Sequence, residues 1–140
     1  VEELGRLLDE DPGLIEAEDT VGATPLSSAA RQGSVDAARF LLDRGAAVDK
    51  MDDYGRTPLM EACYYGRVEV ASLLLSRGAD PSVQTSQGAT ALILASEARG
   101  DHGSDYVAVI RLLIKDGRVP VDARDEEGWT ALFWACCIGW

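Results

Sequence analysis

A five-residue motif recurs along the chain at a nearly constant interval, and this internal repeat limits the fold more than any other feature. The motif occurs as Gly22-Ala23-Thr24-Pro25-Leu26 and returns 33 residues later as Gly55-Arg56-Thr57-Pro58-Leu59. It recurs in altered form at residues 88–92 and, after a longer interval of 40 residues, at residues 128–132. A unit of this length is too small to bury its own apolar face, so neighbouring units must stack as a solenoid.

Each unit has the pattern of two short helices followed by an extended loop. In the second full unit, Thr57 is suited to cap a helix and Pro58 to occupy its first turn. Apolar residues then recur at three- and four-residue spacing, and Gly66 is suited to end the helix. Residues 68–75 form a second, largely apolar helical segment, which closes at Gly78. The sequence therefore predicts a helix, a turn, a second helix and a loop in every unit.

The pattern Asp-x-x-Gly-x-Thr-Pro-Leu-x-x-Ala-Ala-x-x-Gly, followed by an apolar helix and Gly-Ala-Asp, resembles the ankyrin repeat. The resemblance covers essentially the whole chain. It implies an all-α solenoid of stacked helix-turn-helix units joined by β-hairpin-like loops. We predict a single domain, residues 1–140, with a half repeat at 1–18, full repeats at 19–51, 52–84 and 85–124, and a half repeat at 125–140.

The ends and some internal positions depart from this pattern. Residues 1–8 read as the second helix of a preceding unit, and we expect further repeats or domains in a longer parent chain. The histidine that usually follows Thr-Pro-Leu is replaced in every unit, so the hydrogen bonds it makes between ankyrin repeats are expected to be absent. The third full unit has Arg99 where glycine is usual and six extra residues within 99–105, which predicts a longer loop between its helices.

Charge and composition exclude several classes of partner. The chain has 13 lysines and arginines against 24 aspartates and glutamates, a formal net charge of −11 that repels nucleic acid and anionic lipid. Its apolar runs are shorter than the roughly 20 residues that cross a bilayer, so no membrane insertion is expected. Three cysteines without a Cys-x-x-Cys pair, and no visible signal peptide, favour an intracellular location, cytoplasmic or nuclear.

The chain offers little that could perform catalysis. Its one histidine, His102, lies in the loop of the third unit, where a histidine-based triad would lack a rigid support. Asp101, His102 and Asp105 could be imagined as metal ligands, but a solvated loop is the simpler interpretation. No glycine-rich stretch is followed by Lys-Ser or Lys-Thr, as a phosphate-binding loop requires. We therefore predict no enzyme activity, no cofactor and no metal.

The resemblance implies that a partner binds in the concave groove between the hairpin tips and the first helices. We predict partner contacts from Asp53, Tyr54, Arg56, Glu61, Tyr64, Tyr65, Glu126, Glu127, Trp129 and Trp134. Further groove positions, transferred in the same way, are Thr20, Val21, Ala23, Arg31, Gln32, Met60, Ser86, Gln87, Ala89, Ile93, Leu94, Glu97, Phe133 and Ile138, with Asp52 and Asp125 at the rim. Aromatic rings surrounded by acids favour a basic or mixed protein or peptide partner with an apolar anchor. Packing of the rings between repeats, and acidic tips that only aid solubility, are the structural alternatives.

Two other functions remain open at this stage. Some ankyrin-like domains of regulated ribonucleases hold a phosphorylated nucleotide between repeats, and residues 54–62 are loosely similar to one of theirs. Against such small-molecule sensing, Arg31, Arg56 and Arg67 are scattered among acids, whereas an anionic ligand needs clustered cations. The other alternative is self-association through the apolar last helix, which would make the chain a scaffold segment.

Overall fold

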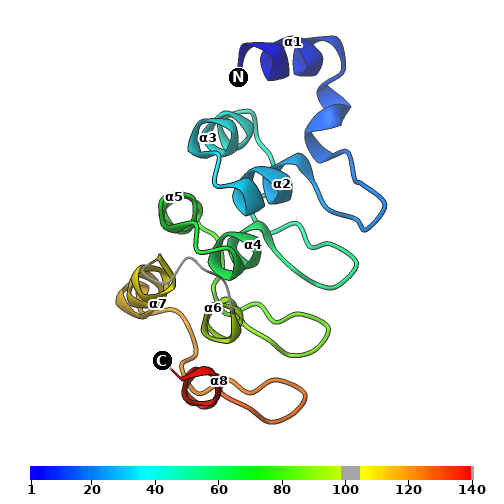
Figure 1. Ribbon diagram of the computed structural model, residues 1–140. Helices are drawn as coiled ribbons and strands as arrows, with labels where there is room; N and C mark the ends of the chain where they lie inside the picture. Colours follow the sequence, from blue (N-terminus) through cyan, green and yellow to red (C-terminus); the bar gives the residue numbers. More distant parts are fainter. Residues whose placement is uncertain (99–104, 140) are drawn as a thin grey trace.

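The computed structural model describes residues 1–98 and 105–139, and all regular elements within these residues are helical. Figure 1 shows first and second helices of successive units in two adjacent columns, with the hairpin loops projecting to one side. This confirms the expected all-α repeat solenoid. The elements are α1 (Glu2–Glu10), the 3-10 helix η1 (Pro12–Glu16), α2 (Pro25–Gln32), α3 (Val35–Asp43), α4 (Pro58–Tyr64), α5 (Val68–Ser76), α6 (Ala91–Glu97), α7 (Asp105–Asp116) and α8 (Ala131–Ile138).

The two irregular regions of the sequence differ in what the structure adds. At the N-terminus, α1 runs to Glu10 rather than to residue 8, and the sequence analysis did not predict η1. This 3-10 helix begins where the Asp11 carboxylate accepts a hydrogen bond from the backbone N–H of Gly13, 2.9 Å away. The predicted insertion at residues 99–105 and the candidate His102 lie, except for Asp105, outside the described residues.

Threonine caps explain why the first helix of each unit begins where it does. Thr24, Thr57, Thr90 and Thr130 each accept a hydrogen bond through Oγ1 from the backbone N–H three residues ahead, at 3.3–3.4 Å. These side chains stand in for the missing acceptors of the first helical turn. The Thr-Pro or Thr-Ala pair therefore positions α2, α4, α6 and α8 in the same way in every unit.

Stacking of the first helices forms the centre of the molecule. α2 contacts α4, α4 contacts α6, and α6 contacts α8, while the second helices α3, α5 and α7 form a parallel column against them. Leu26, Leu59 and Leu92 occupy equivalent positions and are buried between units. Leu132, at the same position of α8, is 74% exposed because no further helix covers α8 in the described part of the chain.

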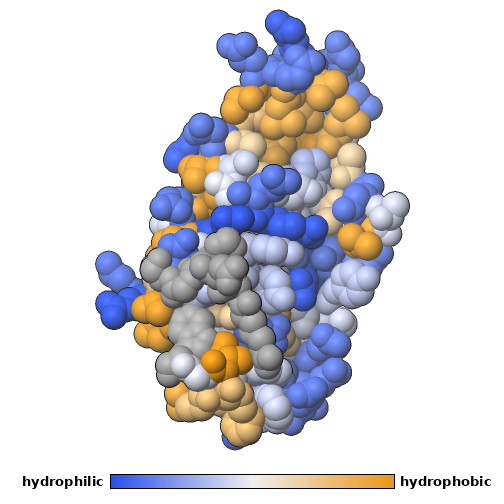
Figure 2. All heavy atoms as spheres, in the orientation of Figure 1, coloured by the Kyte–Doolittle hydropathy of each residue, from blue (hydrophilic) through white to orange (hydrophobic). Residues whose placement is uncertain are grey.

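The same difference separates two equivalent cysteines. Cys63 is buried in the contact of α4 with its neighbours. Cys136 occupies the same position of α8 but is exposed, because no further helix covers α8 among the described residues. Figure 2 shows hydrophobic surface gathered near both ends of the stack, around α1 and around α8. Among the described residues, no helix is long and apolar enough to cross a membrane.

Backbone hydrogen bonds join the hairpin loops into a continuous wall beside the first helices. In the second full unit the loop closes on Asp52, whose N–H donates to the carbonyl oxygen of Arg56 at 3.0 Å. Consecutive tips are linked as well: Asp53 N–H donates to Val21, Ser86 to Tyr54 and Glu126 to Gln87, at 2.9–3.0 Å. The tips are therefore held at a fixed spacing along the stack.

Glycine is required where one tip approaches the next. Gly55 has φ +73°, and a Cβ added there would lie 2.9 Å from the backbone nitrogen of Ser86. Gly78, which ends the second helix region of the same unit, also has positive φ, +89°, but nothing lies within 4 Å of an added Cβ. Both positions therefore require a residue that tolerates positive φ, but only Gly55 also requires a residue without a Cβ atom.

Replacing these glycines separates the two effects. Gly78→Ala should lower the free energy of unfolding by about 1–2 kcal/mol, because alanine disfavours positive φ. Gly55→Ala should cost at least about 1 kcal/mol more, because the hairpin of the next unit must also move. Urea unfolding followed by circular dichroism measures both. Equal losses would contradict the steric role of Gly55.

Candidate functional site

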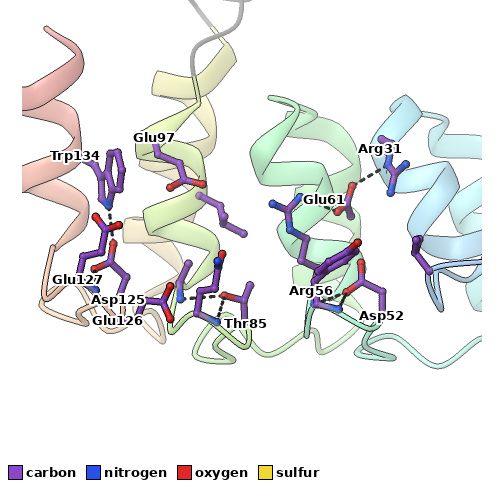
Figure 3. A pocket seen from close by; sticks show the side chains of 15 residues that line it. Arg31, Asp52, Arg56, Glu61, Thr85, Glu97, Asp125, Glu126, Glu127 and Trp134 are labelled. Atoms are coloured by element: carbon purple, nitrogen blue, oxygen red, sulfur yellow. Dashed lines mark hydrogen bonds and ion pairs between the residues drawn. The ribbon is translucent and has the colours of Figure 1, made fainter.

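A hollow of about 560 Å³ lies between the hairpin wall and the first helices, on the face where the groove was predicted. We call it the central hollow. Its lining comes from the first full unit through to α8, so it crosses the boundaries between units. Figure 3 shows Arg31, Arg56 and Glu61 together at one end, and Glu97, Trp134 and the acids of the last hairpin at the other.

The structure brings six of the ten predicted contact residues into the lining of this hollow. They are Tyr54, Arg56, Glu61, Glu126, Glu127 and Trp134. The other four, Asp53, Tyr64, Tyr65 and Trp129, lie outside the lining. Asp53 is exposed at a hairpin tip. Tyr64 and Trp129 pack against residues that do line the hollow, and Tyr65 packs against Tyr64.

Glu61 of α4 is the most enclosed charged residue of the site. Its side chain is 2% exposed and accepts a hydrogen bond at Oε2 from Arg31 Nε, 2.9 Å away. Its other oxygen, Oε1, lies 3.4 Å from Arg56 Nη1. Arg31 belongs to α2 and Glu61 to α4, so the Arg31–Glu61 ion pair connects two units. A polar contact between units was expected to be absent because the histidine that usually follows Thr-Pro-Leu is replaced in this chain. Glu61 holds the two arginines in place and has little surface left for a partner.

Two tyrosines support Arg56 from outside the hollow. The Arg56 guanidinium lies over the ring of Tyr64, 5.2 Å from its centroid, as in a cation–π contact. The Tyr65 ring meets that of Tyr64 edge to face, with centroids 5.2 Å apart. We conclude that Tyr64 acts on the hollow through Arg56 rather than as part of its lining.

At the opposite end, Asp125 organises the last hairpin and Trp134. Its Oδ1 accepts hydrogen bonds from the backbone N–H groups of Trp129 and Glu127, at 2.8 and 3.1 Å. Its Oδ2 accepts a hydrogen bond from the indole Nε1 of Trp134, at 2.8 Å. The Trp129 ring packs against Trp134 with centroids 4.7 Å apart. Trp134 is thus fixed in the lining, with Trp129 bracing it.

Glu97, the last residue of α6, lies at the same end of the hollow as Trp134 and the last hairpin (Figure 3). Burial raises the pKa of its carboxyl group, the field of Arg56 opposes this, and the nearby charges of Asp125 and Glu127 raise it further. None of the ion pairs or hydrogen bonds found among the described residues involves the Glu97 side chain. A partly buried carboxylate beside other acids is a site where added positive charge lowers the free energy.

The lining also shows where reasoning from repeat positions failed. Met60 and Ile93 were expected in the groove but are buried between helices, because the first-helix faces around them are covered by neighbouring units. Thr85 lines the hollow and was missed. It takes the place of Asp52 and Asp125 in its hairpin, and its Oγ1 accepts from the Ala89 N–H at 3.1 Å. Alignment of the hairpins would have found it.

Comparison with known proteins agrees with the repeat seen in the sequence. A family model described as "Ankyrin repeats (3 copies)" matches residues 3–85 and again residues 75–139. The two matches overlap and together span nearly the whole chain. No curated protein sequence matches it.

The ion pairs that Glu61 makes with Arg31 and Arg56 predict that Glu61 stabilises the fold. Glu61→Gln removes the charge that Arg31 and Arg56 share and should lower the free energy of unfolding by about 1–2 kcal/mol. The loss stays modest because the Arg31 side chain is 41% exposed and can be solvated again. Urea unfolding checks this, with Glu69→Gln on the exposed side of α5 as the control, expected within about 0.5 kcal/mol of wild type. Equal effects of the two substitutions would refute the role of Glu61.

Removing the charge of Glu97 should stabilise the fold, whereas removing that of Glu61 should destabilise it, and the effect at Glu97 should depend on pH. Because the pKa of its carboxyl group is raised in the folded protein, the ionised form destabilises the fold above that pKa, and the penalty disappears as the pH falls below the ordinary value of 4.5. Glu97→Gln should therefore increase the urea midpoint at pH 7 and leave it unchanged at low pH. Unfolding curves of both proteins across this pH range test the prediction. A midpoint lowered by the substitution at pH 7 would show that the charge is stabilised instead.

Proposed function

The chain belongs to the ankyrin-repeat family, whose members are generally protein–protein interaction modules, and we propose that it holds a segment of a partner protein in the central hollow. The observation that carries the proposal is the hollow itself, which crosses unit boundaries and has preorganised polar and aromatic walls. Tyr54 is 57% exposed on a tip whose backbone is tied to the next hairpin. Tyrosine is enriched among the residues that contribute most to the binding energy of protein interfaces.

We propose that binding here involves no chemistry on the partner. Within residues 1–98 and 105–139, no group of three or more His, Cys, Asp or Glu side chains is placed to hold a metal. Cys63 is fully buried, and burial raises the pKa of its thiol, so it stays protonated and inaccessible as a nucleophile. The lining instead consists of acids, two arginines, and aromatic and small residues.

Nucleotide sensing finds less support. Arg31 and Arg56 do converge at one end of the hollow, closer together than their separation in sequence suggested. Both are bound to Glu61, however, and every other charged residue among those lining the hollow is an acid. A phosphate group would have to displace or neutralise that carboxylate. Self-association through the exposed Leu132 and Phe133 of α8 stays a prediction that concentration-dependent mass would test.

We also propose that the chain works inside the cell. Cys63, Cys136 and Cys137 are free thiols, and two of them are exposed on α8. Exposed free thiols are typical of proteins kept in a reducing compartment. Acidic side chains around the hollow favour a protein or peptide partner and disfavour nucleic acid.

Truncating the exposed ring tests the proposed function. Tyr54→Ala should weaken partner binding about 30-fold, as expected for loss of a hot-spot ring worth about 2 kcal/mol. The measurement is recovery of partners from cell lysate on the immobilised chain, followed by affinity measurement with the partner identified. The matched control is Ile114→Ala, which shortens an exposed apolar side chain on α7, in the column of second helices. Equal binding by both variants would place the partner elsewhere.

A further inference from the structure

Charge is divided unequally between the two ends of the central hollow. At the end nearer the N-terminus, Arg31 and Arg56 are accompanied by two acids, Glu61 and Asp52. At the other end, the lining contributes four acids and, among the described residues, no lysine or arginine: these are Glu97, Asp125, Glu126 and Glu127. The ligand that complements this end carries positive charge.

The acids at this end are spread around an aromatic ring rather than gathered about a point. Trp134 on α8, Glu97 on α6 and the acids of the last hairpin line this end of the hollow from three different elements (Figure 3). The indole N–H of Trp134 is already used by Asp125, at 2.8 Å, and Trp129 packs against part of its ring, so the ring surface that lines the hollow remains as its means of recognition. The described residues contain no set of carboxylates close enough to hold a metal ion. This arrangement fits a flat organic cation better than Ca²⁺ or Mg²⁺.

Of the four acids, Glu97, Glu126 and Glu127 have side chains without a hydrogen bond or ion pair among the described residues, and of the latter two it is Glu127 whose charge acts on Glu97. Asp125 is occupied by Trp134 and by two backbone N–H groups of its own hairpin. Glu97 has no hydrogen-bonded or ion-paired partner among the described residues, and burial, together with its acidic neighbours, raises the pKa of its carboxyl group against the field of Arg56. The Glu127 backbone is fixed by Asp125, at 3.1 Å, while its side chain lines the hollow.

We infer that this acidic end binds the guanidinium group of an arginine from an extended partner segment, stacked on Trp134 and paired with Glu97 and Glu127. The inference rests on the proposed function. Arginine is preferred to lysine because its planar group stacks on an aromatic face and offers five N–H donors to separate carboxylates. The hollow, about 560 Å³, has room for neighbouring residues of the segment, which extend toward Tyr54.

Selection from a displayed library of random short peptides tests this inference without knowledge of the natural partner. The library is selected in parallel on the wild-type chain, on the double variant Glu97→Gln/Glu127→Gln and on the control Glu2→Gln/Glu69→Gln. The control removes the same amount of charge from exposed positions of α1 and α5. Circular dichroism verifies that all three proteins are folded.

We expect peptides selected on the wild type and on the control to share an arginine at one position, and the double variant to lose that preference. A synthetic copy of a selected peptide with citrulline in place of this arginine should bind the wild type about 30-fold more weakly. Citrulline keeps the shape of the side chain and removes its charge, so it isolates the ion pairing.

The other outcomes separate this inference from the proposed function. Peptides that bind the wild type, lose affinity with Tyr54→Ala and share no basic residue would overturn the arginine site and leave the proposed function standing. Lysine at the shared position would overturn the stacking on Trp134. Arginine retained equally on the double variant would place its contact elsewhere. Failure to select any peptide on the wild type would contradict both proposals.

Discussion

The burial of each unit's leucine against the next unit is the interaction on which the rest of the structure depends. Leu26, Leu59 and Leu92 are enclosed where helices of their own and of neighbouring units meet, and Leu132 is exposed at the same position of α8, which no later helix covers among the described residues. A single helix pair cannot bury enough apolar surface to be stable, so the stability and the position of each pair depend on its neighbours. Whatever shifts one first helix therefore shifts its neighbours and the hairpins attached to them.

The central hollow is a product of this stacking combined with the hairpin wall. The caps at Thr57, Thr90 and Thr130 set where the first helices begin, and the bonds from tip to tip set the spacing of the loops. The backbone of the site is thus nearly the same in each unit. Its chemistry changes along the stack because the side chains at equivalent positions differ, which produces arginines at one end and acids at the other.

Sequence reasoning succeeded where the backbone repeat decides the outcome and failed where side-chain direction decides it. The period, the threonine caps and the recurring glycines predicted the helices, and the resemblance to ankyrin repeats implied the face on which the hollow lies. The same positions could not tell that Glu61 is enclosed by two arginines or that Met60 and Ile93 are covered. Those facts depend on the fit between neighbouring units. The extent of α1 and the presence of η1 were also missed, because residues 1–18 lack the repeated motif.

The carboxylates of Glu61 and Glu97 differ in their electrostatic surroundings in the protein without a bound partner. The negative charge of Glu61 is already paired with Arg31 and Arg56, so this side chain stabilises the stacking of the units. A ligand cation would have to compete with the two arginines for it. Glu97 has a raised pKa and acidic neighbours, so its charge opposes folding until a cation compensates it. A carboxylate that destabilises the free protein and pairs with a ligand contributes to affinity in full, because no internal partner is lost on binding. This difference is why we assign recognition to the end of the hollow at Glu97 and architecture to the end at Glu61.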